Sequence, residues 1–144
     1  SGEDVEVHAL PFYHCAQLHV FFAPGVLLGA TNVIVPAPDP GLLLEVIEAE
    51  RATKLFCPPT VWISLLRHPD LERRDVSSLR FLMHGGSPIA TEVVRRATRA
   101  FPTTELVHVY GATETGPFSI AYGGPRDRPR AAGVRGKESL ATRA

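Results

Sequence analysis

Short apolar runs alternate with helix-like stretches along most of this chain. Five runs rich in aliphatic and β-branched residues, bounded by proline, glycine or polar residues, are typical of buried strands. They cover residues 5–10, 32–36, 53–57, 79–85 and 105–111. Between them, apolar residues recur three or four positions apart, a spacing that gives a helix one apolar face. These helical stretches cover residues 17–29, 39–51, 58–66 and 87–97.

The regular alternation of strands and helices predicts an α/β fold with a parallel sheet covered on both faces. We expect a five-stranded, mostly parallel, doubly wound sheet with the strand order 2-1-3-4-5 of flavodoxin-like folds. After Gly116 the chain is rich in glycine, proline and arginine, and the pattern predicts no further strand or helix. Residues 1–125 are therefore expected to form one α/β subdomain, followed by a basic, irregular tail at 126–144.

Local signals define several of these elements more closely. Asp39 precedes a proline and predicts the N-cap of one helix, and Ser87 with Pro88 predicts the start of another. Pro24 should interrupt the helix-like stretch that contains it. Trp62 falls on the apolar face of its helix, so we expect it in the core.

Composition narrows the class of protein. The 144 residues contain 15 basic and 15 acidic side chains, and a net charge of zero gives no indication of nucleic-acid binding. No apolar run approaches the roughly 20 residues of a membrane span. Cys15 and Cys57 are too few for a disulfide framework, and both lie in apolar surroundings. We expect reduced cysteines in the core of a cytoplasmic protein.

Unusual residues gather where the predicted strands end. In a doubly wound sheet, ligands bind beyond the carboxyl ends of the strands. The segments at those ends are "PFYH" at 11–14, "PPT" at 58–60, "HGGSP" at 84–88 and "YGATETG" at 110–116. We therefore expect a binding site along that edge of the sheet.

The segment "YGATETG" combines groups suited to a nucleotide. Tyr110 ends a strand and can stack on a planar base, and Gly111 permits a close approach. Thr113 offers a hydroxyl to a phosphate, and Glu114 offers a carboxylate to Mg²⁺. The alternative is a strand that ends in a capped turn beside a half-buried Tyr110. The residues alone leave both interpretations open.

The segment "HGGSP" has the same two interpretations. Gly85 and Gly86 let the backbone approach a flat ligand closely, and a helix that starts at Ser87 favours a bound anion. The same residues also suit an ordinary turn between a strand and a helix.

His14 lies in "PFYH", at the expected mouth of the crevice. It fits a gate or acyl-pocket residue, or a buried, hydrogen-bonded histidine. No further cysteine or histidine stands at a spacing that would complete a metal site around it. The chain also has no G-x-S-x-G elbow, no P-loop and no dinucleotide-binding G-x-G-x-x-G segment.

Four segments together resemble one family. "LPFYH", "FCPPTVWISLLRHPDL", "SSLRFLMHGGSPI" and "HVYGATETG" stand in the order and spacing found in the adenylate-forming (AMP-binding) superfamily. That superfamily includes acyl-CoA synthetases, peptide-synthetase adenylation domains and beetle luciferases. The resemblance covers residues 3–125 and is strongest to fatty-acid or aryl-acid CoA ligases.

The resemblance implies a two-step reaction that uses ATP, Mg²⁺ and coenzyme A. A carboxylic acid, such as a fatty acid, attacks the α-phosphorus of ATP and forms an acyl-adenylate and pyrophosphate. The thiol of coenzyme A then displaces AMP. Negative charge develops on phosphate oxygens in both steps, which suits hydroxyl, backbone and metal ligands.

The resemblance also assigns roles on the nucleotide side of the site. Tyr110 would stack on adenine, and His108 would lie near the adenine amino group, where relatives often carry Asn or Gln. Thr113 and Glu114 would be the catalytic residues, with Thr113 on the α-phosphate and Glu114 holding Mg²⁺.

The remaining assignments concern the acyl side. Gly85, Gly86 and Ser87 would line the adenine and acyl part of the pocket. His14 and His84 would belong to the pocket for the acid substrate.

Several family motifs are missing from this chain. The Ser/Thr/Gly-rich phosphate loop, the ribose-binding aspartate and the catalytic lysine of the C-terminal domain are not found, and Lys54 and Lys137 have the wrong context. The chain therefore resembles one subdomain of a larger ligase, and we expect it to be inactive without that remainder. Surface that the remainder would cover can also support a homodimer.

Three alternatives remain at this point. The chain can be a piece of a peptide-synthetase adenylation domain, although no pocket aspartate for an amino group is evident. It can be a truncated, non-enzymatic subdomain that folds and self-associates. It can also be a free-standing flavodoxin-like binding module.

Overall fold

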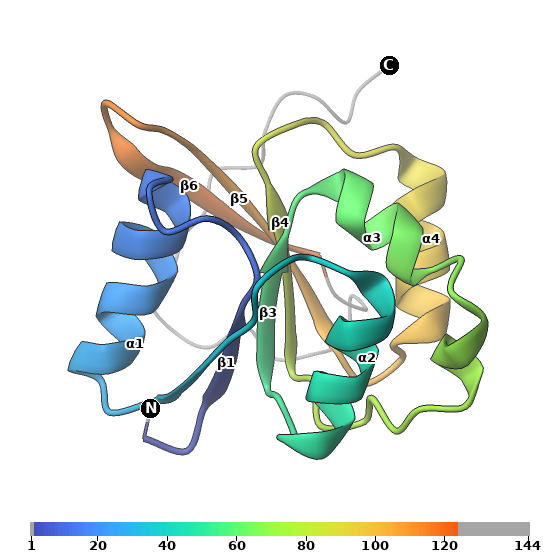
Figure 1. The fold of residues 1–144 in the computed structure, drawn as a ribbon. Coiled ribbons are helices and arrows are strands. Elements are labelled where there is room, and N and C mark those ends of the chain that lie inside the picture. The colour runs from blue at the N-terminus through green and yellow to red at the C-terminus, as the bar shows by residue number, and fades with distance from the viewer. Residues whose placement is uncertain (1, 124–144) are drawn as a thin grey trace.

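The computed structural model describes residues 2–123, which form a six-stranded sheet with helices on both faces (Figure 1). The strands are β1 (Val5–His8), β2 (Thr31–Ile34), β3 (Lys54–Cys57), β4 (Phe81–Gly85), β5 (Glu105–Ala112) and β6 (Gly116–Gly123). The helices are the π-helix η1 (Ala16–Phe22), α1 (Ala23–Leu27), α2 (Pro40–Ala49), α3 (Pro59–Leu65), the 3-10 helix η2 (Pro69–Glu72) and α4 (Thr91–Ala100).

The strand order is β2-β1-β3-β4-β5-β6, and β1 to β5 run parallel. The predicted α/β fold and the order of these five parallel strands are confirmed. The prediction that no element follows Gly116 was wrong, because β6 pairs antiparallel with β5. The long β5 has an outer edge that β4 does not occupy, and a tight turn lets the next segment fold back onto that edge.

Helix starts follow the local signals in one case and depart from them in another. The Asp39 carboxylate accepts a hydrogen bond from the Leu42 N–H at 2.9 Å and caps α2, as predicted. The predicted start of α4 at Ser87 was wrong, because α4 begins at Thr91 after Ala90. Residues 87–90 are used instead to carry the chain from the end of β4 to the helix.

The prediction that Pro24 interrupts its helical stretch was wrong. The π-helix η1 passes directly into α1, and Pro24 lies in the first turn of α1. Pro24 has no backbone N–H to donate to the preceding turn, and the last π-helical hydrogen bond, from the Ala23 N–H to the Leu18 carbonyl, ends just before it. The chain thus changes from π to α geometry at the proline.

The main core lies between the sheet and α2, α3 and α4, which all cover one face in Figure 1. Trp62 of α3 is 3% exposed, and its indole N–H donates to the Met83 carbonyl at 3.2 Å. The expected core position of Trp62 is confirmed. Cys57 is also fully buried here, and burial raises the pKa of its thiol to about 12.

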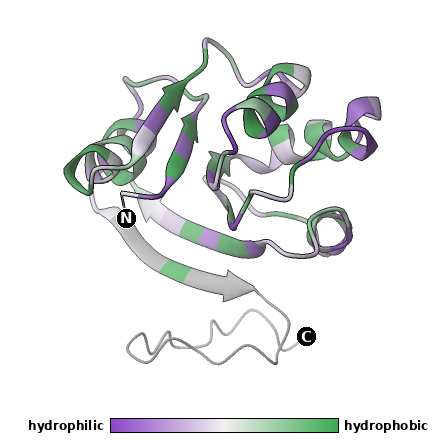
Figure 2. Ribbon diagram, turned by 90° about the horizontal axis from the view of Figure 1, so that it is seen from below, coloured by the Kyte–Doolittle hydropathy of each residue, from purple (hydrophilic) through white to green (hydrophobic). Residues whose placement is uncertain are grey.

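The opposite face carries η1 and α1, where Phe21 of η1 stacks on Phe56 of β3 with ring centroids 4.2 Å apart. The residues of β5 alternate between hydrophobic and hydrophilic along the strand (Figure 2), so its two faces serve different surroundings. Within residues 2–123, no helix has the length and apolar character needed to cross a membrane.

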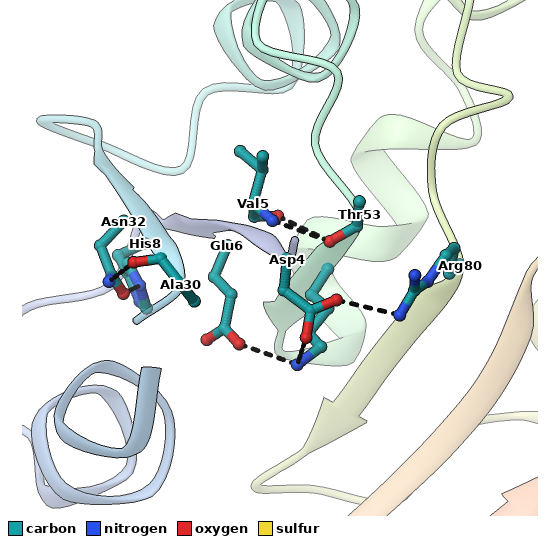
Figure 3. Close-up of polar contacts among 9 residues, drawn as sticks. Asp4, Val5, Glu6, His8, Ala30, Asn32, Thr53 and Arg80 are labelled. Carbon is teal, nitrogen blue, oxygen red and sulfur yellow. Dashed lines mark hydrogen bonds and ion pairs between the residues drawn. The ribbon is translucent and has the colours of Figure 1, made fainter. Parts of the chain in front are cut away.

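An ionic cluster joins the amino-terminal ends of three parallel strands (Figure 3). Asp4 is 3% exposed and pairs with Lys54 at 2.8 Å and with Arg80 at 2.9 Å, and Lys54 also pairs with Glu6 at 2.9 Å. Burial alone would raise the pKa of Asp4, but the hydrogen bond and charge of Lys54 lower it to about 2. The cluster secures the edge of the sheet opposite to the one where a ligand is expected.

Candidate functional site

A cleft of about 350 Å³ opens at the carboxyl edge of the sheet, on the face that carries η1. One wall comes from the chain after β1 and from η1, and the other comes from the ends of β4 and β5. Aliphatic and aromatic side chains dominate the cleft, and the few polar groups near its rim are His14, Cys15 and Thr113.

The structure brings five of the predicted site residues to this cleft. They come from three separate segments and are His14, Gly85, Gly86, Gly111 and Thr113. His14 is exposed at the rim, as expected for a residue at the mouth of the crevice. The common location of these residues follows from the parallel topology, which places the ends of β4 and β5 side by side.

The two glycines of "HGGSP" are required for different physical reasons. A Cβ on Gly85 would lie 2.2 Å from the carbonyl oxygen of Val109, so the neighbouring strand excludes any side chain there. Gly86 has a φ of +80° with open space around it, so it is needed for its backbone conformation. Packing of β4 against β5 therefore explains the glycine at position 85 without a ligand. The glycine at position 86 is explained by its backbone conformation, and it adds no side chain to the cleft.

Three predicted residues lie on the other face of the sheet. Because side chains alternate along a strand, Val109 and Gly111 line the cleft while His108 and Tyr110 point away from it. His84 pairs with His108 across β4 and β5, and the two rings stack with centroids 4.7 Å apart and an interplanar angle of 7°. Tyr110 is 61% exposed at the same end of the sheet.

The turn between β5 and β6 holds the predicted catalytic pair. Thr115 braces this turn, since its hydroxyl accepts from the Ala112 N–H at 3.4 Å and donates to the Gly116 carbonyl at 3.3 Å. Thr113 lies at the cleft, while Glu114 is exposed beside it and does not line it. Ser87 is also exposed and outside the cleft.

The residues at the turn fit a magnesium ion only together with a substrate. No three His, Cys, Asp or Glu side chains in the described part of the chain are grouped to hold a metal. Mg²⁺ is commonly held by one or two carboxylates plus substrate phosphate oxygens. The single exposed carboxylate of Glu114, next to the Thr113 hydroxyl, suits that kind of site.

The prediction that Cys15 lies in the core was wrong, because this residue is half-buried at the cleft. Its Sγ lies 3.5 Å from the Thr113 hydroxyl. Two segments almost a hundred positions apart thus meet at the rim.

Sequence reasoning missed a buried polar group that positions η1. The Nε2–H of His8 donates to the Asn32 side chain at 2.7 Å, and its Nδ1 accepts from the Gln17 amide. Gln17 in turn accepts from the Leu10 N–H at 3.3 Å. These bonds tie the π-helix to β1 and β2, and π-helical turns are frequent at functional sites. A histidine inside an apolar strand, "VEVHAL", was the available signal.

Two buried histidines make stability depend on pH. Burial, reinforced by the charge of His108, lowers the pKa of His84 to about 4, and burial also lowers the pKa of His8. Between pH 6.5 and 4 the unfolded chain therefore binds more protons than the folded chain, so stability falls as the pH falls.

We expect the free energy of unfolding to be lower at pH 5 than at pH 7, with about 2 kcal/mol of the loss from His84. Urea titrations at the two pH values measure this difference. His84→Gln should reduce it, whereas replacement of the exposed His19 by Gln should leave it unchanged. An equal difference in His84→Gln would contradict the assignment. The carboxyl of Asp4 titrates below this range and does not interfere.

The fold and the cleft together define an α/β domain with an open cleft beyond the carboxyl ends of its parallel strands, the place where doubly wound folds bind their ligands. The chain belongs to the AMP-binding enzyme family, whose sequence profile matches residues 1–138. The resemblance found from the four sequence segments is therefore confirmed.

The relatives that match in sequence include CoA ligases. The chain is 36% identical over 117 residues to a feruloyl-CoA synthase of an Amycolatopsis species, covering 81% of this chain and 23% of that protein. It is 32% identical over 137 residues to an indoleacetate–CoA ligase of Aromatoleum aromaticum, covering 95% of this chain and 26% of the relative. The chain thus spans about a quarter of the length of these relatives.

Solved structures show the same fold. ATP-bound MatB from Rhodopseudomonas palustris superposes with a TM-score of 0.77 at 28% identity, over 90% of this chain and 25% of that one. The luciferase-like enzyme of the mealworm Zophobas morio gives a TM-score of 0.76 at 30% identity, over 81% of this chain and 28% of that one. The sheet described above is thus the one found in adenylate-forming enzymes.

Proposed function

We propose that this chain is a subdomain of an ATP-dependent carboxylate–CoA ligase, and that its cleft receives the acid. The observation that carries the proposal is the meeting of His14, Gly86, Gly111 and Thr113 at one cleft, from three distant segments. The similarity to CoA ligases supports the same reaction. The sequence leaves a fatty acid and an aromatic acid open as substrates.

The chain's own residues contribute to binding and charge stabilisation. The Thr113 hydroxyl, at the cleft rim, donates a hydrogen bond to a phosphate oxygen beside the acid. The exposed Glu114 holds Mg²⁺, which neutralises phosphate charge when it is bound. His14 lies at the opening of the cleft, where the acid enters.

A second group of residues contacts the adenine by stacking. Tyr110 and His108 present aromatic rings at the carboxyl end of β5, on the face away from the cleft. His84, predicted from the sequence to lie in the acid pocket, is buried against His108 on that same face and does not line the cleft. Stacking on such rings is favourable for any planar base. The strand end of β5 therefore separates a base side from an acid side, with the phosphates at the turn between them.

The partners follow from the reaction. ATP and coenzyme A are the co-substrates, and the remainder of the ligase supplies the phosphate loop and the catalytic lysine. We place the protein in the cytoplasm, where thiols stay reduced. The 144-residue chain alone is inactive in this proposal, and the exposed side chains of Val26, Leu27 and Leu28 mark surface that the remainder covers or that a second copy occupies.

Pyrophosphate exchange tests the proposal. The full-length protein that contains this chain should incorporate labelled pyrophosphate into ATP only when a carboxylic acid is added, and should then release AMP with coenzyme A. The 144-residue chain should show no exchange. Exchange by the short chain alone would overturn its assignment as an inactive subdomain, and absence of exchange in the full-length protein with any acid would overturn the ligase reaction.

A further inference from the structure

Charged side chains are unevenly distributed over the layer formed by α2, α3 and α4. Arg67, just after α3, and Arg96 and Arg99 of α4 are exposed and form no salt bridge within the described part of the chain. Arg95 of α4 has only an exposed pair with Glu92 at 3.8 Å. The other described arginines each pair with a carboxylate at 2.8–3.7 Å. The positive charge of α4 is therefore largely uncompensated within this part of the chain.

The other side of this layer is acidic. Glu45 of α2, Glu50 at its C-cap and Glu72 of η2 are exposed, and they form no salt bridge within residues 2–123. Successive helices join successive strands, so the strand order β1-β3-β4-β5 places α3 between α2 and α4. One face of the molecule thus carries carboxylates along one side and arginines along the other.

The centre of this face has small side chains. Thr60 and Ser64 are the exposed residues of α3, and the Ser64 hydroxyl donates to the Thr60 carbonyl at 3.2 Å. A second layer of helices can therefore approach closely. The exposed side of α4 adds no large apolar side chain, because Val94 and Ala97 pack toward the core. An anionic membrane is thus a poor fit, since helices that bind a membrane surface bury apolar side chains in it.

We propose that the helical face, formed by α2, α3 and α4, binds the same face of a second copy of the chain. A two-fold axis that runs along α3 lays α2 of each copy on α4 of the other, so each acidic helix meets a basic one. This inference goes beyond the proposed function and does not depend on it. The exposed apolar side chains at 26–28 lie at the end of α1, across the sheet, and take no part in this contact.

The charges of the two helices lie at matching levels. Both α2 and α4 have ten residues, and both run from the carboxyl edge of the parallel strands toward the opposite edge. Glu45 is the sixth residue of α2, and Arg95 is the fifth residue of α4. Glu50 and Arg99 lie near the ends of the same two helices. The two-fold rotation therefore brings each glutamate opposite an arginine, whose guanidinium is suited to a carboxylate.

Sedimentation velocity of the full-length protein tests whether association is electrostatic. We expect a reversible dimer whose Kd rises about tenfold or more between low and high salt, because exposed ion pairs are screened. A monomer at every protein concentration, or a dimer that is insensitive to salt, would overturn the inference.

Charge-reversed variants locate the contact. Glu45→Arg combined with Glu50→Arg makes both helices basic, so this double variant should stay monomeric. Arg95→Glu combined with Arg99→Glu makes both helices acidic and should have the same effect. An equimolar mixture of the two should form a mixed dimer with a Kd within about tenfold of the wild-type value, because each basic helix again meets an acidic one. Dimers of either double variant alone, or no mixed dimer, would contradict the proposed contact.

Further variants cover the other outcomes. Leu28→Ala removes an exposed apolar side chain of the opposite face and should leave the dimer unchanged. Circular dichroism checks the fold of the double variants. If either fails to fold, the single neutral changes Glu45→Gln and Arg99→Gln should each raise the Kd about fivefold, since each removes two symmetric ion pairs. Loss of the dimer in Leu28→Ala, or an unchanged Kd in both neutral variants, would assign association to another surface and overturn the inference.

Discussion

Replacement of Glu114 with Gln is expected to lower kcat/KM for adenylate formation by the full-length protein by about 100-fold or more. Gln keeps the size and hydrogen-bonding capacity of the side chain but removes the negative charge that a magnesium ion requires. Glu114 is exposed in the turn between β5 and β6, so the substitution should leave the fold intact. Steady-state assays at several Mg²⁺ concentrations measure the effect.

The dependence on Mg²⁺ distinguishes a lost metal ligand from general damage. In Glu114→Gln, part of the activity should return as the Mg²⁺ concentration rises. Glu92→Gln serves as the control, because Glu92 is an exposed acid on α4 that pairs weakly with Arg95 at 3.8 Å. Wild-type activity in Glu114→Gln would show that another group holds the metal.

Replacement of Gly85 with Ala is expected to have the second large effect, a loss in the free energy of unfolding. The added Cβ would lie 2.2 Å from the Val109 carbonyl oxygen, so β4 and β5 must move apart. Inserting atoms into a close-packed region costs typically about 1–3 kcal/mol, and a collision with backbone belongs at the upper end. Urea denaturation of the 144-residue chain should show a loss of about 3 kcal/mol or a failure to fold.

Gly86→Ala is the matched control for this experiment. No atom lies within 4 Å of its added Cβ, so its only penalty is the left-handed backbone at a φ of +80°. That strain costs about 1–2 kcal/mol for a residue with a side chain. A loss in Gly85→Ala no larger than that in Gly86→Ala would mean that the strands adjust easily and that packing does not demand a glycine.

The parallel strands could be predicted because each is a local apolar run. Residues 53–57 and 79–85, for example, are bounded by polar residues and match β3 and β4 closely. The strand β6 was missed because its glycines and proline resemble a loop. Only the long free edge of β5, a property of the assembled sheet, makes this segment a strand.

The candidate site was predictable in its location and less so in its geometry. Parallel topology alone brought Gly86 and Thr113 to one cleft. The alternation of side chains along β5 directs Tyr110 and Gly111 to opposite faces, and this period of two is visible in the sequence. The contact between Gln17 and His8 depends on how the π-helix packs on β1, so no local pattern could reveal it.

The turn that carries Thr113 and Glu114 has a mechanical consequence. It joins two paired strands and is braced by Thr115, so it is the tip of a hairpin and not a free loop. A displacement of the paired strands would therefore carry the backbone of Thr113 and Glu114 along together. A neighbouring domain in contact with β6 would then move Thr113 and Glu114 together, because both belong to the turn of the same hairpin.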